Sequence, residues 1–262
     1  TQDGPSGGIF DYIIVGAGSA GCVLANRLTA SGHYKVLLLE AGGSDRNPWI
    51  HIPLGYAKHF TNPKVNWMYY AEDGVEWVKR AVYQPRGKVL GGSSSINGMV
   101  YIRGQKEDYD HWRQLGNTGW SYDDVLPYFR KSEDQKRGAD EFHGVGGPLA
   151  VSDPKEPHPL AEAFLSAAES GGYQRNPDFN GAEQEGFGYY QWTVRNGLRC
   201  SAAVGYLKPA HARANLSIVT QAHATRIEFS AERASGLTYR KDGHLHTARL
   251  AEGGELLVSG GA

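Results

Sequence analysis

Three glycines near the N-terminus have the spacing of a site that binds a dinucleotide. In the segment Gly16-Ala17-Gly18-Ser19-Ala20-Gly21, the first glycine allows a tight turn off a strand. The second lets the backbone approach a pyrophosphate, and the third lets a helix pack closely on a sheet. The free N–H groups and the positive dipole end of that helix then favour phosphates. The pattern predicts a cofactor of the NAD or FAD type and does not separate the two.

An acidic residue lies at the distance expected for a contact with ribose. Glu40 follows Gly21 by 19 residues and ends an apolar run. A carboxylate there accepts hydrogen bonds from ribose hydroxyls and repels a 2′-phosphate, which disfavours NADP. A glycine triplet alone is weak evidence, but between a buried strand and a helix, with an acid at this distance, it is strong. The alternative is a glycine turn with only a structural role.

A second glycine cluster covers residues 86–104, which read RGKVLGGSSSINGMVYIRG. Adjacent glycines, three serines and an asparagine offer many backbone and hydroxyl groups, which suit the polar edge of a ring system or a phosphate. A tight Gly-Ser turn without a ligand explains the same residues, so the residue types alone leave both interpretations open.

Two strands and a helix must position these motifs. Residues 10–16 form a β-branched apolar run that ends in glycine, residues 20–31 have helical periodicity, and residues 35–40 form a second buried strand. Such a short strand–helix–strand unit predicts a parallel sheet with both faces covered.

The residue pattern in the rest of the chain predicts a mixture of helices and strands. We expect covering loops with short helices over residues 44–80. The charged run 130–141 predicts a solvated loop, with a lid or a partner contact as the alternative. Asn196-Gly197 and Asp242-Gly243 predict hairpin turns. Helices are expected at 108–115, 121–132 (capped by Ser121), 159–169 and 202–211, and strands at 189–194, 216–220, 225–229, 234–239, 244–250 and 255–259.

Composition excludes several classes of protein. Among 262 residues, 40% are hydrophobic and 21% charged, and the net charge is −1, which disfavours disorder and offers no basic field for nucleic acid. Two cysteines cannot build a disulfide framework. No apolar run reaches the ~18 residues that a membrane helix needs, and no secretory pattern opens the chain. We expect a cytoplasmic protein, with peripheral membrane association as an alternative.

The sequence resembles the glucose–methanol–choline (GMC) oxidoreductases, FAD-dependent enzymes that mostly oxidise alcohols. The family's opening resembles FDYIIVGAGSAGCVLANRL and VLLLEAGG, and its first signature resembles GKVLGGSSSINGMVYIRG. Further blocks follow in family order: NWMYY, DYDHW, GWSYDDVLPYFRKSE, FHGVGGPL, NLSIVTQAHATRI and ELLVSGGA. Within the family, the resemblance favours the choline-dehydrogenase-like and alcohol-dehydrogenase-like branch.

The resemblance implies which residues hold FAD. The first glycine turn and Glu40 would hold the ADP half, and the second cluster would line the pyrophosphate, ribityl chain and flavin. Two later segments would offer backbone around the adenosine, and Trp67 would lie near the cofactor. The implied residues are Gly16, Gly18, Ser19, Ala20, Glu40, Ala41, Trp67, Arg86, Gly87, Leu90, Gly91, Gly92, Ser93, Asn97, Gly98, Met99, Val100, His223, Ala224, Ser259, Gly260 and Gly261.

The resemblance also implies a fold and a domain order. The expected α/β fold is an FAD-binding Rossmann-like βαβ sheet with an inserted α+β portion of a substrate domain. The FAD-binding domain would cover residues 9–155 and 213–262, and the substrate-domain portion residues 156–212. Because the last apolar strand runs into Gly260-Gly261-Ala262 without a following helix, we interpret the chain as the N-terminal part of a larger protein.

The implied enzyme is an FAD-dependent dehydrogenase or oxidase acting on CH–OH groups. It would oxidise a primary alcohol to an aldehyde by hydride transfer to flavin N5, while a base takes the hydroxyl proton. The family's catalytic histidine lies in its C-terminal half, and none of the ten histidines here matches it. No catalytic residue is therefore predicted in this chain. We expect a C-terminal remainder or a companion chain as partner, beside a small-molecule alcohol, and neither nucleic acid nor a transmembrane segment.

Two alternative functions stay open, and several single residues have separate interpretations. FAD could be structural, as in lyases of the family, or the chain could be an NAD-dependent dehydrogenase. Some relatives bond the flavin covalently to a histidine where this chain has Ile96, so non-covalent FAD and no metal are expected. Cys22 is interpreted as a packed residue, Cys200 as inert or a reactive thiol, and the pair His244 and His246 as a solvated strand face or metal ligands. The sequence assigns no role to His143.

Overall fold

The computed structural model describes residues 7–71 and 81–261, and the chain divides into two compact units. Unit 1 comprises Thr1–Gly98 and Arg199–Ala262, and unit 2 comprises Met99–Leu198. These boundaries differ from those expected after residues 155 and 212. The reason is that β5 (Val100–Tyr101) pairs with β8 (Gln191–Trp192), so the chain enters and leaves unit 2 on adjacent strands.

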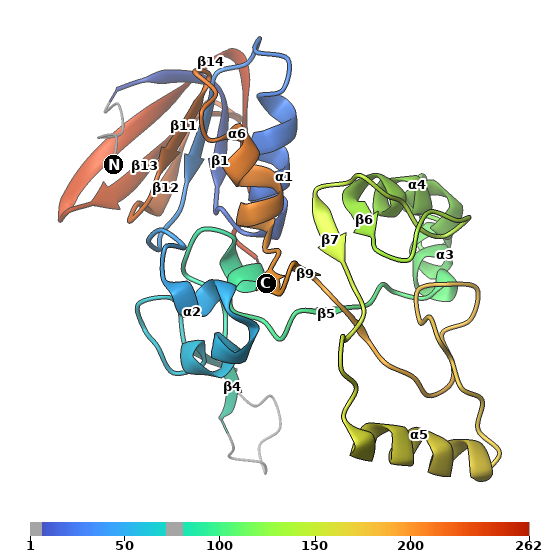
Figure 1. Ribbon diagram of the computed structural model, residues 1–262. Helices are drawn as coiled ribbons and strands as arrows, with labels where there is room; N and C mark the ends of the chain where they lie inside the picture. The colour runs from blue at the N-terminus through green and yellow to red at the C-terminus, as the bar shows by residue number, and fades with distance from the viewer. Residues whose placement is uncertain (1–6, 72–80, 262) are drawn as a thin grey trace. The chain divides into compact units, whose positions relative to one another are not determined.

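Unit 1 is built on a six-stranded sheet with the order β11-β2-β1-β14-β13-β12 (Figure 1). The first strand, β1 (Ile9–Val15), lies parallel to β2 (Val36–Leu39), and α1 (Ser19–Leu28) connects them. All four residues of β2 are buried, as expected for a parallel strand covered on both faces. The predicted βαβ unit and the α/β fold class are confirmed.

The strand β14 (His244–Val258) is one continuous strand where two were expected. Its first part lies antiparallel to β13 (Arg233–Lys241), and it runs parallel to β1 from the pair Ile9–Arg249 to the pair Val15–Val258. The register shifts between Phe10, which pairs with Leu250, and Tyr12, which pairs with Glu255. The residues between the two expected strands, which include Gly253 and Gly254, therefore lie in a bulge opposite β1.

The two remaining strands of the six-stranded sheet follow the sequence prediction. They are β11 (Leu216–Val219) and β12 (His223–Ser230). Asp242 and Gly243 have φ of 49° and 79°, which is the left-handed geometry of the predicted hairpin turn. On one face of the sheet, α1 packs against the π-helical turn η3 (Ala203–Leu207) and α6 (Lys208–Ala210) (Figure 1).

Short elements connect β2 to the second glycine cluster. They are α2 (Pro48–His51), η1 (Pro53–His59), β3 (Tyr69–Ala71), β4 (Val82–Gln84) and η2 (Gly92–Ser95). This agrees with the covering loops and short helices expected over residues 44–71, whereas residues 72–80 of that prediction lie outside the described residues. A bridge between Gly43 and Val89 brings the cluster beside the end of β2.

Unit 2 contains three helices and several short strands. The bounds of its helices lie close to the predicted ones. Ser121 caps the second helix and forms a capping box with Asp124. Asn196 and Gly197 form the expected turn between β9 and β10. The elements are α3 (Lys106–Gln114), α4 (Tyr122–Ser132), α5 (Pro159–Ser170), β6 (Glu133–Gln135), β7 (Leu149–Val151), β9 (Val194–Arg195) and β10 (Leu198–Arg199).

The interior of unit 2 is unusually polar. The charged run expected to be a solvated loop contains β6, in which Glu133 and Gln135 are buried. The other buried polar residues of this unit are Arg103, His143, Asn176, Asn180 and Gln191. The buried hydrophobic residues in the described part of unit 2 are Met99, Tyr122, Ala150, Val151 and Leu165. Directional polar bonds therefore fix much of this unit.

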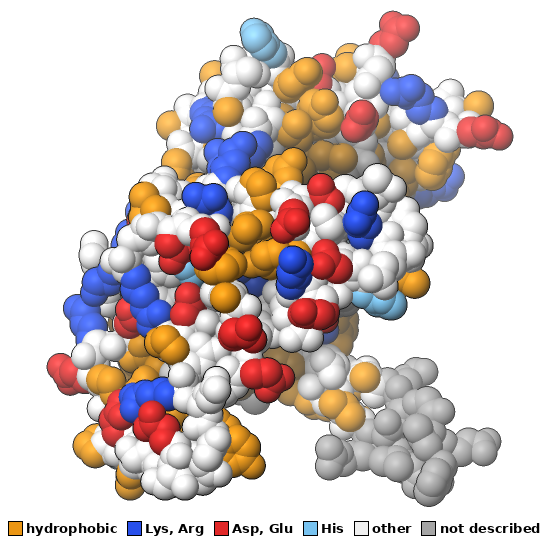
Figure 2. Space-filling model, turned by 90° about the vertical axis from the view of Figure 1, so that its right-hand side faces the viewer, with side chains coloured by type: hydrophobic (Ala, Val, Ile, Leu, Met, Phe, Trp, Pro, Cys, Tyr) orange, Lys and Arg blue, Asp and Glu red, His pale blue; other side chains and the backbone are white. Residues whose placement is uncertain are grey.

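The surface agrees with the balanced charge of the sequence. Figure 2 shows acidic and basic side chains interspersed over one face, as expected for a net charge of −1. Within residues 7–71 and 81–261, no helix combines the length and the apolar character that a bilayer crossing requires.

Candidate functional site

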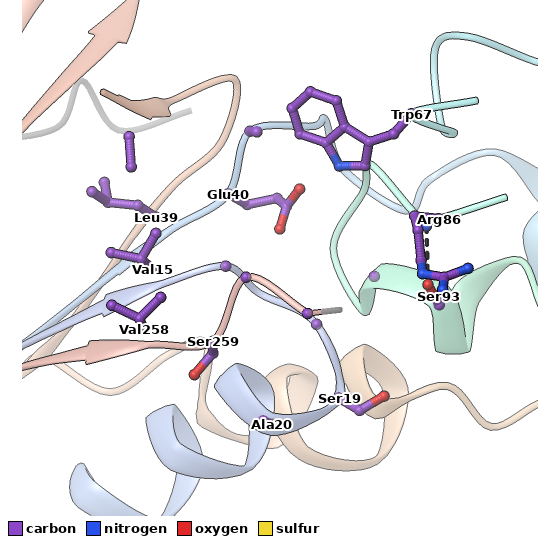
Figure 3. A pocket seen from close by; sticks show the side chains of 18 of the residues that line it. Val15, Ser19, Ala20, Leu39, Glu40, Trp67, Arg86, Ser93, Val258 and Ser259 are labelled. Carbon is purple, nitrogen blue, oxygen red and sulfur yellow. Dashed lines mark hydrogen bonds between the residues drawn. The ribbon is translucent and has the colours of Figure 1, made fainter. Parts of the chain in front are cut away.

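A cavity of about 610 Å³ lies in unit 1 at the carboxyl ends of the parallel strands (Figure 3). Open α/β sheets bind ligands at this edge. Val15, Leu39 and Val258, the last residues of β1, β2 and β14, form its apolar side (Figure 3). The other lining residues are Gly16, Gly18, Ser19, Ala20, Glu40, Ala41, Trp67, Tyr69, Arg86, Gly87, Gly92, Ser93, Ala222, His223, Ala224, Ser259, Gly260 and Gly261.

The first glycine turn fits the separate tasks expected of its glycines. A Cβ on Gly16 would lie 2.5 Å from the carbonyl oxygen of Ser259, and one on Gly21 would lie 1.9 Å from that of Gly16. A Cβ on Gly18 would meet nothing within 4 Å, so its space is open to a ligand. Gly18 is the N-cap of α1 and provides no side-chain cap, which leaves the first N–H groups of that helix for an anion.

Glu40 joins the first glycine turn to the turn after β2. Its Oε2 accepts a hydrogen bond from the backbone N–H of Ala17 at 2.9 Å, and its Oε1 accepts one from Gly42 at 2.8 Å. Burial raises the pKa of the Glu40 carboxyl, and these two bonds act against that rise. A carboxylate has about four acceptor positions, so Glu40 retains capacity toward the cavity that it lines.

The second glycine cluster packs directly against the first. Gly91 and Gly92 have φ of 88° and 54°, a left-handed conformation that glycine adopts without strain. The N–H of Gly91 donates to the carbonyl of Ala17 at 2.8 Å, and a Cβ on Gly92 would lie 2.7 Å from the Cα of Gly18. Two motifs separated by about 70 positions thus form one backbone surface.

An aromatic group forms another wall of the cavity. Trp67 stacks on Tyr69 with ring centroids 5.7 Å apart, and His223 contacts it edge-on at 5.6 Å. The ammonium of Lys88 lies 4.5 Å from the centre of the Trp67 ring. A flat ring held on several sides is suited to a planar heterocycle. Trp67 and Glu40 both reach into the same space (Figure 3).

Most of the residues implied by the resemblance line this one cavity, and six do not. These six are Leu90, Gly91, Asn97, Gly98, Met99 and Val100. Leu90 packs against the core around α1, and Met99 and Val100 belong to unit 2.

Sequence reasoning missed five lining residues, namely Val15, Leu39, Tyr69, Ala222 and Val258. The strand ends among them carry a usable signal, because each one directly precedes a predicted turn.

The other residues singled out in the sequence lie outside the cavity. Cys22 is buried, donates to the Ala17 carbonyl at 3.2 Å, and has its pKa raised to about 12 by burial, so it is not a thiolate. Cys200 is buried as well. His246 stacks on Tyr239, and within residues 7–71 and 81–261 no group of three metal-ligating side chains gathers.

His143 occupies the centre of the polar interior of unit 2. Its Nδ1 lies 3.0 Å from Oε1 of Glu133, and its Nε2 lies 2.8 Å from Oδ2 of Asp178. Burial disfavours the charged imidazole, but hydrogen bonds to Asp178 and Glu133 outweigh burial and raise the pKa of His143 to about 9. Arg103 completes the cluster with an ion pair to Glu133 at 2.7 Å.

Two curated proteins are similar to nearly the whole of this chain. Choline dehydrogenase, mitochondrial, from Mus musculus is 46% identical over 260 residues, which are 97% of this chain and 43% of that protein. Alcohol dehydrogenase [acceptor] from Pseudomonas putida is 46% identical over 255 residues, 97% of this chain and 46% of that protein. The chain thus spans about half the length of the curated relatives it matches.

Solved structures and a family profile also match nearly the whole of this chain. Pyridoxine 4-oxidase from Mesorbium loti superposes with a TM-score of 0.90 at 33% identity and covers 96% of this chain and 49% of its own. A formate oxidase of Aspergillus oryzae, studied for FAD modification, gives 0.87 at 28% identity, with 97% and 45% coverage. The profile described as GMC oxidoreductase matches residues 10–262. The chain therefore belongs to the GMC oxidoreductase family.

Proposed function

We propose that this chain binds FAD non-covalently and forms part of an enzyme that oxidises a primary alcohol to an aldehyde. One observation carries the proposal: in a chain of the GMC family, two glycine turns, three parallel strand ends and Glu40 surround a single cavity. The alcohol substrate is suggested by the names of the relatives, which include choline dehydrogenase and alcohol dehydrogenase [acceptor].

The residues of the cavity fit the ADP half of FAD. The N–H groups at the start of α1 would bind the pyrophosphate across the open space at Gly18. Glu40 would accept hydrogen bonds from the ribose with the capacity left by Ala17 and Gly42. Trp67 would present its ring to the adenine side, and Arg86 adds a cation to the lining.

Bound FAD supplies hydride-accepting chemistry, and the protein supplies binding, orientation and exclusion of water. The loop of residues 91–98 is the part of unit 1 that would continue the cradle toward the flavin. In the described part of this chain we assign no base to the alcohol. We propose that a C-terminal remainder or a companion chain supplies it, which agrees with relatives about twice as long. The cytoplasmic location and the peripheral membrane association considered above stay predictions.

The side chain of residue 96 favours non-covalent retention. Ile96 is buried in an apolar cluster with Ile50, Val65 and Val89, and an alkyl side chain has no nucleophilic atom. FAD would therefore be held by hydrogen bonds and packing alone.

The proposal is tested with the purified full-length protein under anaerobic conditions. A yellow protein absorbing near ~450 nm, which is a flavin property, excludes an NAD-dependent dehydrogenase. Choline and a series of primary alcohols are then added. Bleaching by an alcohol with aldehyde formed in equal amount is the expected result, whereas a flavin that no alcohol bleaches contradicts alcohol oxidation and favours structural FAD.

A further inference from the structure

Arg199 is a buried arginine that sequence reasoning did not single out, and it holds the second glycine cluster by hydrogen bonds to Ser94 and Asn97. Its side chain is among the largest of the fully buried ones, with 1% exposure. Its Nη1 donates to the carbonyl of Ser94 at 3.1 Å and to Oδ1 of Asn97 at 2.7 Å, and its Nη2 donates to the carbonyl of Asn97 at 2.7 Å. Its Nε donates to the carbonyl of Ile50 at 2.8 Å.

The segment that begins at Arg199 supports the same loop in other ways. The N–H of Ala202 donates to Oγ of Ser94 at 2.9 Å, and that hydroxyl donates to the carbonyl of Gly91 at 2.5 Å. A Cβ on Gly91 would lie 3.2 Å from the Cβ of Ala203. The loop of residues 91–98 is therefore fixed by residues that do not line the cavity, whereas Gly92 and Ser93 of the same loop do line it.

The charge of Arg199 is not balanced by the groups that bind it. All of the acceptors described above are neutral carbonyl oxygens, and within residues 7–71 and 81–261 no carboxylate forms an ion pair with its guanidinium. Burial lowers the pKa of Arg199 to about 10, so the group is still a cation at neutral pH. A buried cation without an anion is costly, which calls for a negative group nearby.

We propose that Arg199 is a positioning residue for the loop of residues 91–98, and that the cofactor bound on the cavity side of this loop balances its charge. This inference rests on the proposed function. The pyrophosphate of FAD is anionic in both redox states. Hydride addition also takes the ring system from neutral to one negative charge, because the hydride brings a proton and an electron pair. A buried cation in contact with this loop therefore favours FAD binding and favours the reduced state further.

The test compares three variants of the full-length FAD-loaded protein. Arg199→Met removes the charge and the hydrogen bonds, and Arg199→Lys keeps the charge without the planar guanidinium. Arg213→Met is the matched control, because Arg213 is also in unit 1 but donates to the carbonyl of Asn26 in α1 and to the hydroxyl of Thr29, the C-cap of α1. The readouts are the FAD dissociation constant of the apoprotein, by fluorescence titration, and the midpoint potential of the bound flavin.

In Arg199→Met we expect FAD affinity to fall by roughly 10- to 100-fold, the range of charged hydrogen bonds. We expect the potential to become more negative by ~30 mV for each tenfold loss of preference for the reduced state. Arg199→Lys should lose affinity but keep a potential close to the parent, and Arg213→Met should change neither. If Arg199→Met does not fold, Arg199→Lys still tests the inference, since a potential of Arg199→Lys more negative than that of the parent by ~30 mV or more contradicts it.

Unchanged affinity and potential in Arg199→Met would overturn the inference. A loss of affinity with an unchanged potential would overturn its electrostatic part, because the residue would then only shape the loop. Failure of the proposed function looks different, since the parent protein itself would then bind no flavin.

Discussion

Glu40→Gln should weaken both the fold of unit 1 and the retention of FAD. The substitution preserves the volume of the side chain and removes its charge. In the parent, one carboxylate accepts two backbone hydrogen bonds, from Ala17 at 2.9 Å and Gly42 at 2.8 Å. An amide has one oxygen, so its NH₂ group must face one of these N–H donors.

The magnitude follows from the bonds that change. One charge-assisted hydrogen bond, about 1.5–3 kcal/mol, is lost, and the other becomes an ordinary one of about 0.5–1.5 kcal/mol. Removing a buried charge returns part of this, since burial raises the pKa of Glu40. We therefore expect the free energy of unfolding of the apoprotein to fall by about 2–3 kcal/mol. FAD binding should lose a further ~1.5 kcal/mol, roughly tenfold, at the ribose.

The two effects are measured separately. Urea unfolding of the apoprotein gives the first, and fluorescence titration with FAD gives the second. Glu228→Gln is the control, because Glu228 lies in the same sheet and its contacts are with side chains, the hydroxyl of Thr238 at 2.9 Å and the exposed Arg226 at 3.5 Å. Its unfolding free energy should change by under ~0.5 kcal/mol. Equal unfolding midpoints for Glu40→Gln and the parent would refute the role of the two backbone bonds, and an unchanged FAD dissociation constant would mean that the ribose lies elsewhere.

Three further predictions use other parts of the chain. The pKa of His143 is raised from 6.5 to about 9, so the protonated imidazole stabilises unit 2 by about 3 kcal/mol. This stabilisation is complete below pH 6.5 and is lost as the pH rises through 9. Amide exchange in residues 99–198, corrected for intrinsic rates, should therefore accelerate between pH 7 and 9.5, and a pH-independent corrected rate would contradict this. Gly92→Ala places a Cβ 2.7 Å from the Cα of Gly18. It should cost at least ~2 kcal/mol of stability, visible in urea unfolding, whereas Gly98→Ala meets nothing within 4 Å and should cost less. Finally, acid precipitation of the FAD-loaded protein should leave yellow flavin in the supernatant, because Ile96 cannot bond it, and a pellet that stays yellow would disprove non-covalent binding.

The fold around the first glycine turn could be predicted because its signals are local. β1, α1 and β2 each follow from a few consecutive residues, and Glu40 is found by counting from Gly21. The single strand β14 could not be predicted in this way, since Gly253 and Gly254 have the usual signature of a break. Pairing with β1 on one side overrides that signature, and such pairing is invisible in the sequence of the segment alone.

The polar contacts were the least predictable part. Glu133 lies in a charged run typical of a solvated loop, yet it is buried because Arg103, 30 positions earlier, and His143, 10 positions later, reach it. Arg199 is harder still, since its partners are mostly backbone carbonyls, which every residue has. Long-range partners of these kinds leave no periodicity for a sequence analysis to detect.

The pairing of β1 with β14 also has a consequence for the order in which the protein is made. Ile9 pairs with Arg249, so the ribosome releases β1 about 240 positions before the strand that covers its second edge. All of residues 99–198, which form unit 2, emerge in between and can fold first. Until β14 is made, one edge of β1 stays open to other strands, and an open apolar edge is prone to aggregation. The nascent chain therefore needs protection longest at β1.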